Sequence, residues 1–338
     1  MSRILVTGGG GFIGAHLASE LRKRGNIVRV ADVTFNGHGL GQYCDEELLL
    51  DLRDLGNCLK ATEGMDLVYN LAANMGGIGF ITEIGAEVMR DNILINANML
   101  EAARLNKVKR FLFTSSACVY PEYRQMTPNV IGLKEEDASP ASPDTFYGWE
   151  KLATEKMCEA YKRDHNLDIR VARYHNIYGP HCTYKGGREK SPAALCRKVA
   201  EATDPGTITL WGDGVQTRSY CYIDDAIEGT MKLMESGFSD PINIGSDHMV
   251  SVNEMADLII KCSRKHIVKR YDPTGPQGVR GRNADITLAR RVLGWAPKVS
   301  LDDGLSRTYN WIAHEIAEDR QELNITPTTG RGTNRPGA

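Results

Sequence analysis

Almost at its start the chain reads Arg3-Ile4-Leu5-Val6-Thr7-Gly8-Gly9-Gly10-Gly11-Phe12-Ile13-Gly14. The first five residues of this stretch are largely apolar, which is typical of a buried strand, and residues 12–24 have helical periodicity. Glycines at such a junction permit a tight turn, and unpaired N–H groups at the helix N-terminus attract a phosphate. We therefore predict the first strand and helix of a dinucleotide-binding domain; the alternative is a tight turn without a ligand.

Strand and helix signals alternate along the next part of the chain, as far as residue 173. This alternation is typical of a parallel sheet covered by helices. We predict strands at 27–31, 48–50, 66–71, 110–115 and 168–173, helices at 86–105 and 147–164, and a loop at 33–46. The predicted fold class is α/β, with a Rossmann-type doubly wound parallel sheet in a dinucleotide-binding domain of residues 1–173.

Turns become frequent after residue 174, which predicts a smaller C-terminal α/β lobe of residues 174–322 that binds the substrate. The two parts are interleaved, because late sheet elements are expected to return between about 208 and 245, for instance at 241–245. Helices are predicted at 251–262, where Ser251 and Glu254 have the spacing of a capping box, and at 302–319. The tail, residues 323–338, has a composition typical of disorder.

The overall composition excludes several classes of protein. Of 338 residues, 41% are hydrophobic and 25% charged, and the net charge is -2, so no basic field favours nucleic acid. No apolar run is long enough to span a membrane, and no export signal precedes the glycine loop. The eight cysteines are scattered and the histidines lack metal-ligand spacing. We expect a cytoplasmic protein with reduced thiols and without a metal site.

The strand ends of the first domain suggest how a cofactor would be held. Asp32 ends the second strand, where its carboxylate would accept hydrogen bonds from the adenosine ribose and repel a 2′-phosphate. NAD is therefore expected rather than NADP, although Asp32 could also be a surface residue that closes a strand. The predicted cofactor contacts are Gly8, Gly11, Phe12, Ile13, Gly14 and Asp32, then Asp51 and Leu52 near the adenine, and Ala72 against the cofactor.

Tyr147 and Lys151 are four residues apart, which places them on one face of a helix, one turn apart. A neighbouring ammonium favours the phenolate, so the pKa of Tyr147 is expected to fall toward neutrality. Ser116, at the end of an earlier strand, would hydrogen-bond a substrate hydroxyl while Tyr147 removes its proton and NAD takes the hydride. Lys151 would also hold the nicotinamide ribose. The alternative is an ordinary helix face with an aromatic and a cationic residue.

These motifs together resemble the extended short-chain dehydrogenase/reductase family, whose members act on nucleotide sugars, over roughly residues 3–320. Further strings resemble the branch of that family that inverts GDP-mannose at C3 and C5. They are Ala72-Ala73-Asn74-Met75-Gly76-Gly77-Ile78-Gly79-Phe80, Ser115-Ser116-Ala117-Cys118, Lys185-Gly186-Gly187-Arg188-Glu189-Lys190, Trp211-Gly212-Asp213-Gly214-Val215-Gln216-Thr217-Arg218 and Gly278-Val279-Arg280-Gly281-Arg282-Asn283.

The resemblance implies an isomerase that oxidises C4 of GDP-D-mannose transiently to a ketone. The hydrogens on C3 and C5 then lie next to a carbonyl, and an acid-base pair can invert both centres to give GDP-L-galactose, with GDP-L-gulose as the C5 epimer. In that branch the positions of Cys118 and Lys190 serve as base and acid. Without the resemblance, Cys118 would be a small buried residue and Lys190 a surface charge.

Recognition of a nucleoside diphosphate needs cations and backbone donors. The candidate substrate contacts are Gly76, Ser116, Ala117, Cys118, Asn176, Glu189, Lys190, Ser191, Lys198, Gln216, Thr217, Arg218 and Arg280, any of which could instead be a surface or loop residue. The partner implied is a GDP-sugar, and the resemblance implies a homodimer joined through helices 86–105 and 147–164.

Two other readings stay open. A 4-epimerase or 4,6-dehydratase of the same family would share the scaffold, but a 4-epimerase would leave Cys118 and Lys190 idle. A dehydratase usually needs a carboxylate directly after the serine or threonine of the centre, where this chain has Ala117-Cys118. A non-catalytic NAD-binding protein would have no use for Ser116, Tyr147 and Lys151 together.

Overall fold

The computed structural model describes residues 1–35, 40–276 and 278–325. Its centre is a seven-stranded sheet in which every pair of neighbouring strands is parallel, in the order β11-β6-β5-β4-β1-β2-β3. The strands are β1 (Arg3–Thr7), β2 (Ile27–Asp32), β3 (Glu46–Leu49), β4 (Leu67–Asn70), β5 (Arg110–Ser116), β6 (Ile169–Tyr174) and β11 (Pro241–Ile244). This order is that of a Rossmann-type doubly wound sheet with a seventh strand, which confirms the predicted fold class.

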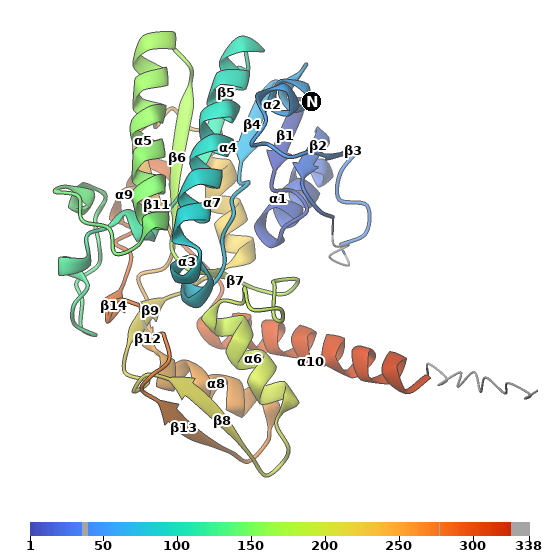
Figure 1. Ribbon diagram of the computed structural model, residues 1–338, viewed down its shortest axis with the longest axis vertical. Helices are drawn as coiled ribbons and strands as arrows, with labels where there is room; N and C mark the ends of the chain where they lie inside the picture. Colours follow the sequence, from blue (N-terminus) through green and yellow to red (C-terminus); the bar gives the residue numbers. More distant parts are fainter. Residues whose placement is uncertain (36–39, 277, 326–338) are drawn as a thin grey trace, which may run out of the picture.

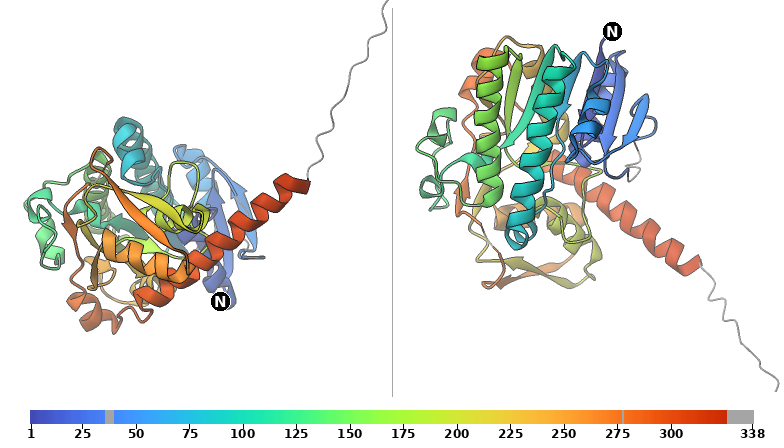
Figure 2. Two further views of the ribbon diagram at one scale, coloured as in Figure 1. Left: turned by 90° about the horizontal axis from the view of Figure 1, so that it is seen from below. Right: turned by 45° about the horizontal axis from the view of Figure 1, so that its top comes forward.

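Helices cover both faces of the sheet (Figures 1 and 2). One face packs against α1 (Phe12–Lys23) and α7 (Ile223–Glu235), and the other against α2 (Leu55–Thr62), α4 (Gly85–Leu105) and α5 (Phe146–His165). Side chains of β1 alternate between the two cores, since Ile4 and Val6 join the first and Leu5 joins the second. Burial on both faces explains why β1 is continuously apolar.

The smaller lobe lies beyond the carboxyl ends of the strands, below the sheet in Figure 1. Its helices are α6 (Ser191–Glu201), α8 (Val252–Ser263) and α10 (Leu301–Ile325), with α9 (Thr287–Leu293) packed on β11. Its strands form short separate sheets: β8 (Gly206–Trp211) with β13 (Ile267–Asp272), and β9 (Thr217–Ser219) between β12 (Met249–Ser251) and β14 (Gly281–Arg282). The remaining elements are β7 (Ile177–Tyr178) paired with β10 (Cys221–Tyr222), α3 (Ile78–Glu83), and the 3-10 turns Ala117–Val119, Glu122–Arg124 and Glu135–Ala138.

Several local expectations need adjustment. Of the late sheet elements expected between 208 and 245, only β11 joins the main sheet, while β8 pairs with β13. The third strand begins two residues earlier than predicted, and α2, α6 and α7 were not predicted as helices. The disordered tail expected at 323–338 lies outside the described residues, apart from residues 323–325, which belong to α10. No helix among the described residues is long and apolar enough to cross a membrane.

Candidate functional site

A cavity of about 1330 Å³ separates the carboxyl edge of the sheet from the smaller lobe. Its walls include the glycine loop, the ends of β4 and β5, the start of α5 and the residues that precede and begin α6. Every predicted cofactor, substrate and catalytic residue lines it except Thr217 and Arg280. Thr217 is buried against the carbonyl of Pro128, and Arg280 forms an ion pair with Asp213 at 2.8 Å.

The glycine loop is shaped for close approach of another group. Gly8 has φ +67° and a Cβ there would lie 2.9 Å from the amide nitrogen of Ala72, while a Cβ on Gly14 would lie 2.1 Å from the Gly8 carbonyl oxygen. A Cβ on Gly11 would meet only that oxygen, at 3.3 Å. Packing of the turn therefore accounts for Gly8 and Gly14, whereas Gly11 faces the cavity. The α1 N-terminus has neither a side-chain cap nor an acidic residue in its first turn, so it fits a pyrophosphate.

Asp32 lies beside this loop and helps to hold it. Its Oδ2 accepts from the backbone N–H of Gly10 at 3.0 Å and its Oδ1 from Val33 at 2.7 Å. The half-buried carboxylate also lines the cavity, where it fits the ribose of an adenosine. Further along this wall, a hydrogen bond from Arg53, opposed by burial, holds the pKa of Asp51 below its ordinary value. Both carboxylates thus line the wall at the adenosine end.

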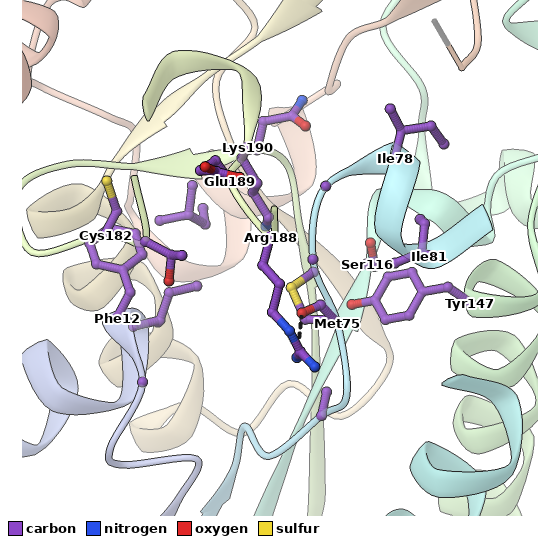
Figure 3. A pocket seen from close by; sticks show the side chains of 18 of the residues that line it. Phe12, Met75, Ile78, Ile81, Ser116, Tyr147, Cys182, Arg188, Glu189 and Lys190 are labelled. Atoms are coloured by element: carbon purple, nitrogen blue, oxygen red, sulfur yellow. Dashed lines mark hydrogen bonds between the residues drawn. The ribbon is translucent and has the colours of Figure 1, made fainter. Parts of the chain in front are cut away.

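In the cavity the side chains of Tyr147 and Ser116 lie next to each other and hydrogen-bond (Figure 3). Burial, together with the charges of Glu150 and Cys118, raises the pKa of Tyr147 well above its ordinary value, and only the hydrogen bond with Ser116 lowers it. The expected fall toward neutrality is therefore wrong for the protein by itself. Lys151 lies 5.5 Å from the Tyr147 ring centroid, but its Nζ is also 3.8 Å from Glu150.

Glu150 belongs to a buried polar network that fixes this end of α5. Its carboxylate accepts a hydrogen bond from the Nδ2 of Asn92 in α4 at 2.9 Å. The Oδ1 of Asn92 in turn accepts from the backbone N–H of Asn74 at 2.6 Å. Burial raises the pKa of Glu150, while Lys151 and Asn92 act in the opposite direction. The start of α5 is therefore tied to the segment that follows β4.

Cys118 has a partner that the sequence did not reveal. The Nη1 of Arg282, from β14, donates to the Cys118 Sγ at 3.2 Å, and the same guanidinium lies 3.5 Å from Asp144. Burial, the largest influence, lowers the pKa of Arg282, but Cys118 and Asp144 together raise it above its ordinary value. The structure thus places a guanidinium in direct contact with the Cys118 sulfur.

Lys190 lies at the N-cap of α6 and enters the same cavity. Burial lowers the pKa of its ammonium, although nearby Cys118 and Cys182 raise it. An amine with a lowered pKa exchanges protons more readily near neutral pH. The structure thus brings a thiol and an ammonium, distant in sequence, into electrostatic contact at one site.

The far end of the cavity has features of a nucleotide site. Lys198 lies 5.4 Å over the ring of Trp211, a half-exposed aromatic residue that lines the cavity and was not predicted. Gln216 donates to the Trp211 carbonyl at 2.9 Å, and its buried Oε1 has no protein partner among the described residues. That acceptor is available to a ligand donor. Asn176, in the left-handed region at φ 42°, donates to the Ser219 carbonyl at 2.9 Å.

Arg188, Trp211 and Arg282 are the site residues that sequence reasoning missed. All three stand inside strings that carry the family resemblance, but nothing in their local spacing separates them from surface residues. Among the described residues, no three His, Cys, Asp or Glu side chains gather as metal ligands would.

Comparisons with known proteins agree with this geometry. Residues 4–245 match the model of the NAD dependent epimerase/dehydratase family. The chain is 51% identical over 321 residues to GDP-mannose 3,5-epimerase 1 of Oryza sativa subsp. japonica, which covers 95% of this chain and 84% of the relative. It is 49% identical over 319 residues to GDP-mannose 3,5-epimerase of Arabidopsis thaliana, with 94% and 84% covered.

A similar solved structure is the UDP-glucuronic acid 4-epimerase of Bacillus cereus in complex with UDP-glucuronic acid and NAD. It has a TM-score of 0.80 and 28% identity to this chain, with 93% of this chain and 99% of that chain covered. The likeness extends over both lobes.

Proposed function

The chain belongs to the NAD dependent epimerase/dehydratase family, and from that membership and the site we propose that it inverts GDP-D-mannose at C3 and C5. The reaction passes through a transient 4-keto sugar and gives GDP-L-galactose, with GDP-L-gulose formed by inversion at C5 alone. The observation that carries the proposal is the pair Cys118 and Lys190, which share the cavity with Ser116 and Tyr147. The relatives at about 50% identity, named as GDP-mannose 3,5-epimerases, support this choice of substrate.

NAD, the cofactor of the family, would supply a hydride acceptor for C4 and a positive pyridinium charge that favours a phenolate at Tyr147. Ser116 orients the C4 hydroxyl and Tyr147 removes its proton. Lys151 holds the cofactor ribose, and Asp32 and the glycine loop hold the adenosine and pyrophosphate. In this assignment Arg218, Lys198 and Gln216 bind the nucleoside diphosphate of the substrate.

The ketone makes the neighbouring C–H bonds acidic enough for side-chain bases. Cys118, with Arg282 against its sulfur, removes a proton from one face of the ring. Lys190 returns a proton to the opposite face, which inverts the carbon. The same pair acts at C5 and C3, and the bound cofactor would supply the hydride that restores the C4 hydroxyl.

The proposal also assigns a role to each of the two parts of the chain. Residues 1–173, joined by β11, form the NAD-binding domain, and residues 174–322 form the interleaved substrate lobe. We place a homodimer contact on the exposed faces of α4 and α5, where Leu94, Phe146 and Trp149 are 42%, 62% and 41% exposed. Exposed apolar side chains on two adjacent helices support such a contact.

Incubation with GDP-mannose in deuterated water, followed by NMR of the hexose, tests the activity. We expect GDP-L-galactose and GDP-L-gulose with deuterium at the inverted carbons, and loss of C5 exchange in Cys118→Ala. The competing candidate is a 4-epimerase activity, because the similar solved structure is a UDP-glucuronic acid 4-epimerase. Untouched GDP-mannose together with C4 inversion of a UDP-hexose would establish that alternative instead.

A further inference from the structure

One loop of the smaller lobe, residues 183–190, reaches across the cavity to residues 74–80 of the sheet domain. In Figure 3 the side chain of Arg188 extends from the neighbourhood of Lys190 and Glu189 toward Met75. The loop therefore forms a bridge between the two lobes, and it ends at Lys190.

Arg188 makes most of the contacts in this bridge. Its guanidinium lies 4.0 Å from the centroid of the Phe80 ring, within the range of a cation–π interaction. Its Nη1 reaches the Asn74 Oδ1 at 3.4 Å and the Met75 carbonyl at 3.5 Å. Its own carbonyl accepts from the backbone N–H of Gly77 at 3.2 Å. Side chain and backbone of one residue thus dock on the same short segment.

The next residue fits closely against the same segment. A Cβ on Gly77 would lie 2.4 Å from the Glu189 carbonyl oxygen, so the backbones of the two lobes nearly touch there. The receiving segment is itself fixed, because Asn74 exchanges hydrogen bonds with Asn92 of α4 at 2.6 and 3.1 Å. Asn92 also holds Glu150 beside Lys151. The bridge therefore rests on the rigid part of the catalytic centre.

The rest of the loop is less constrained. Gly186 and Gly187 have φ values of +96° and +87°, and a Cβ on either would meet nothing within 4 Å. Lys185, another cation of the loop, pairs at 2.5 Å with Asp319 of α10, which belongs to the same lobe. Among the described contacts of residues 185–188, those of Arg188 are the ones that cross to the sheet domain.

We propose that Arg188 is a positioning residue, which by stacking on Phe80 and docking on Gly77 holds Lys190 opposite Cys118 across the sugar ring. This inference rests on the proposed function, because it assumes that Lys190 is the acid of the inversion. Arg188 itself touches neither the ring carbons nor the thiol in this assignment.

The proposal separates two events that inversion combines. The thiolate of Cys118 takes a proton from the carbon next to the ketone, and the C–H electron pair enters the enolate. If the ammonium of Lys190 then delivers a proton to the opposite face, the carbon is inverted. If Lys190 is displaced, the thiol returns a solvent-derived proton to the original face, and exchange occurs without inversion. Neither outcome changes the redox state of the sugar.

The experiment compares Arg188→Ala with wild-type enzyme on GDP-mannose in deuterated water. NMR gives the rate of product formation and the rate of deuterium entry into recovered GDP-mannose. We expect kcat for inversion to fall by about 10- to 100-fold, since misplacement of a reacting group by about 1 Å can cost about 100-fold. The ratio of exchange to inversion should rise by about 10-fold, with little change in KM.

Two controls isolate the bridge. Lys185→Ala removes a cation from the same loop without touching the sheet domain and should keep the wild-type ratio. Phe80→Leu removes the stacking partner and should raise the ratio as Arg188→Ala does, and the double variant should be no worse than either single one. If Arg188→Ala fails to fold, Phe80→Leu tests the same bridge in its place.

The results distinguish the two levels of the proposal. A wild-type enzyme that leaves GDP-mannose unchanged would overturn the proposed function. An active wild-type enzyme whose Arg188→Ala and Phe80→Leu variants keep the wild-type ratio of exchange to inversion would overturn the role of Arg188 alone.

Discussion

At the scale of single residues, the site combines groups whose pKa values are shifted in opposite directions by their surroundings. Burial lowers the pKa of Lys190 and raises that of Tyr147. The guanidinium of Arg282 lies against the Cys118 sulfur in the same cavity. Neighbouring groups in one cavity can therefore carry out different proton transfers.

The lowered pKa of Lys190 predicts an alkaline limit to activity. An acid must carry its proton, and a lowered pKa means that the ammonium loses it at a lower pH than an ordinary lysine, whose pKa is about 10.4. A profile of kcat against pH should therefore fall on the alkaline side below that value. Lys190→Arg keeps its proton throughout, so this limb should disappear even if kcat is reduced. A limb at the same pH in both proteins would exclude Lys190 as its source.

Asp32 predicts the cofactor preference. Asp32→Ala should weaken NAD binding by about 10-fold, the effect of losing hydrogen bonds to a charged acceptor, and should reduce discrimination against NADP. Calorimetric titration with both cofactors measures this. Because Asp32 also accepts from Gly10, Asp32→Asn is the matched control, which keeps an acceptor for the loop. Unchanged affinities for both cofactors in Asp32→Ala would remove the ribose assignment.

At the scale of elements, the turn from β1 to α1 has two separable requirements. Gly14 is required by the packing of the turn, since its missing side chain leaves room for the Gly8 carbonyl. Gly11 has more room and faces the cavity. A turn without a ligand would need Gly14 but would tolerate a methyl group at Gly11.

Two alanine substitutions test this distinction. Gly14→Ala should lower the free energy of unfolding by about 1–3 kcal/mol, since the added methyl group overpacks the turn. Gly11→Ala should destabilise the protein less than Gly14→Ala in urea denaturation, because its Cβ would lie 3.3 Å from the Gly8 oxygen and not 2.1 Å. It should nevertheless weaken NAD binding measurably in calorimetry, because its methyl group would occupy the approach of the pyrophosphate. Wild-type affinity in Gly11→Ala would favour the turn without a ligand at this position.

At the scale of the whole molecule, two lobes face each other across one cavity, and the outer faces of α4 and α5 lie side by side away from it (Figure 2). On their inner sides the same two helices are joined by the hydrogen bond from Asn92 of α4 to Glu150 of α5, next to Lys151. A dimer through the outer faces would therefore rigidify the helix that holds Tyr147.

Trp149→Glu should convert the proposed dimer to a monomer, because a buried charge without a partner is costly at an interface. Light scattering coupled to gel filtration gives the mass directly. Val268→Glu is the control, since Val268 is 64% exposed on β13 in the other lobe. A wild-type protein with the mass of a monomer at micromolar concentration would contradict the dimer.

Some helices were missed although their signals are local. α7 has apolar residues at Ile223, Ile227, Met231 and Met234, a helical spacing that the frequent turns nearby obscured. α2 is only eight residues long and begins at Leu55, after Asp54, whose side chain caps the helix by accepting from the backbone N–H of Asn57. Short helices gain most of their stability from packing, so their sequences carry a weak signal.

The sequence alone determined the first strand, glycine turn and helix, the alternation that produces a parallel sheet, and the Tyr147–Lys151 spacing. Each of these depends on residues near one another in the chain. Only the tertiary structure placed Arg282 against Cys118, 164 residues earlier, and Arg188 against Phe80. It also reversed the expected pKa shift of Tyr147, because loss of water around a side chain is a property of the packed state and has no counterpart in local spacing.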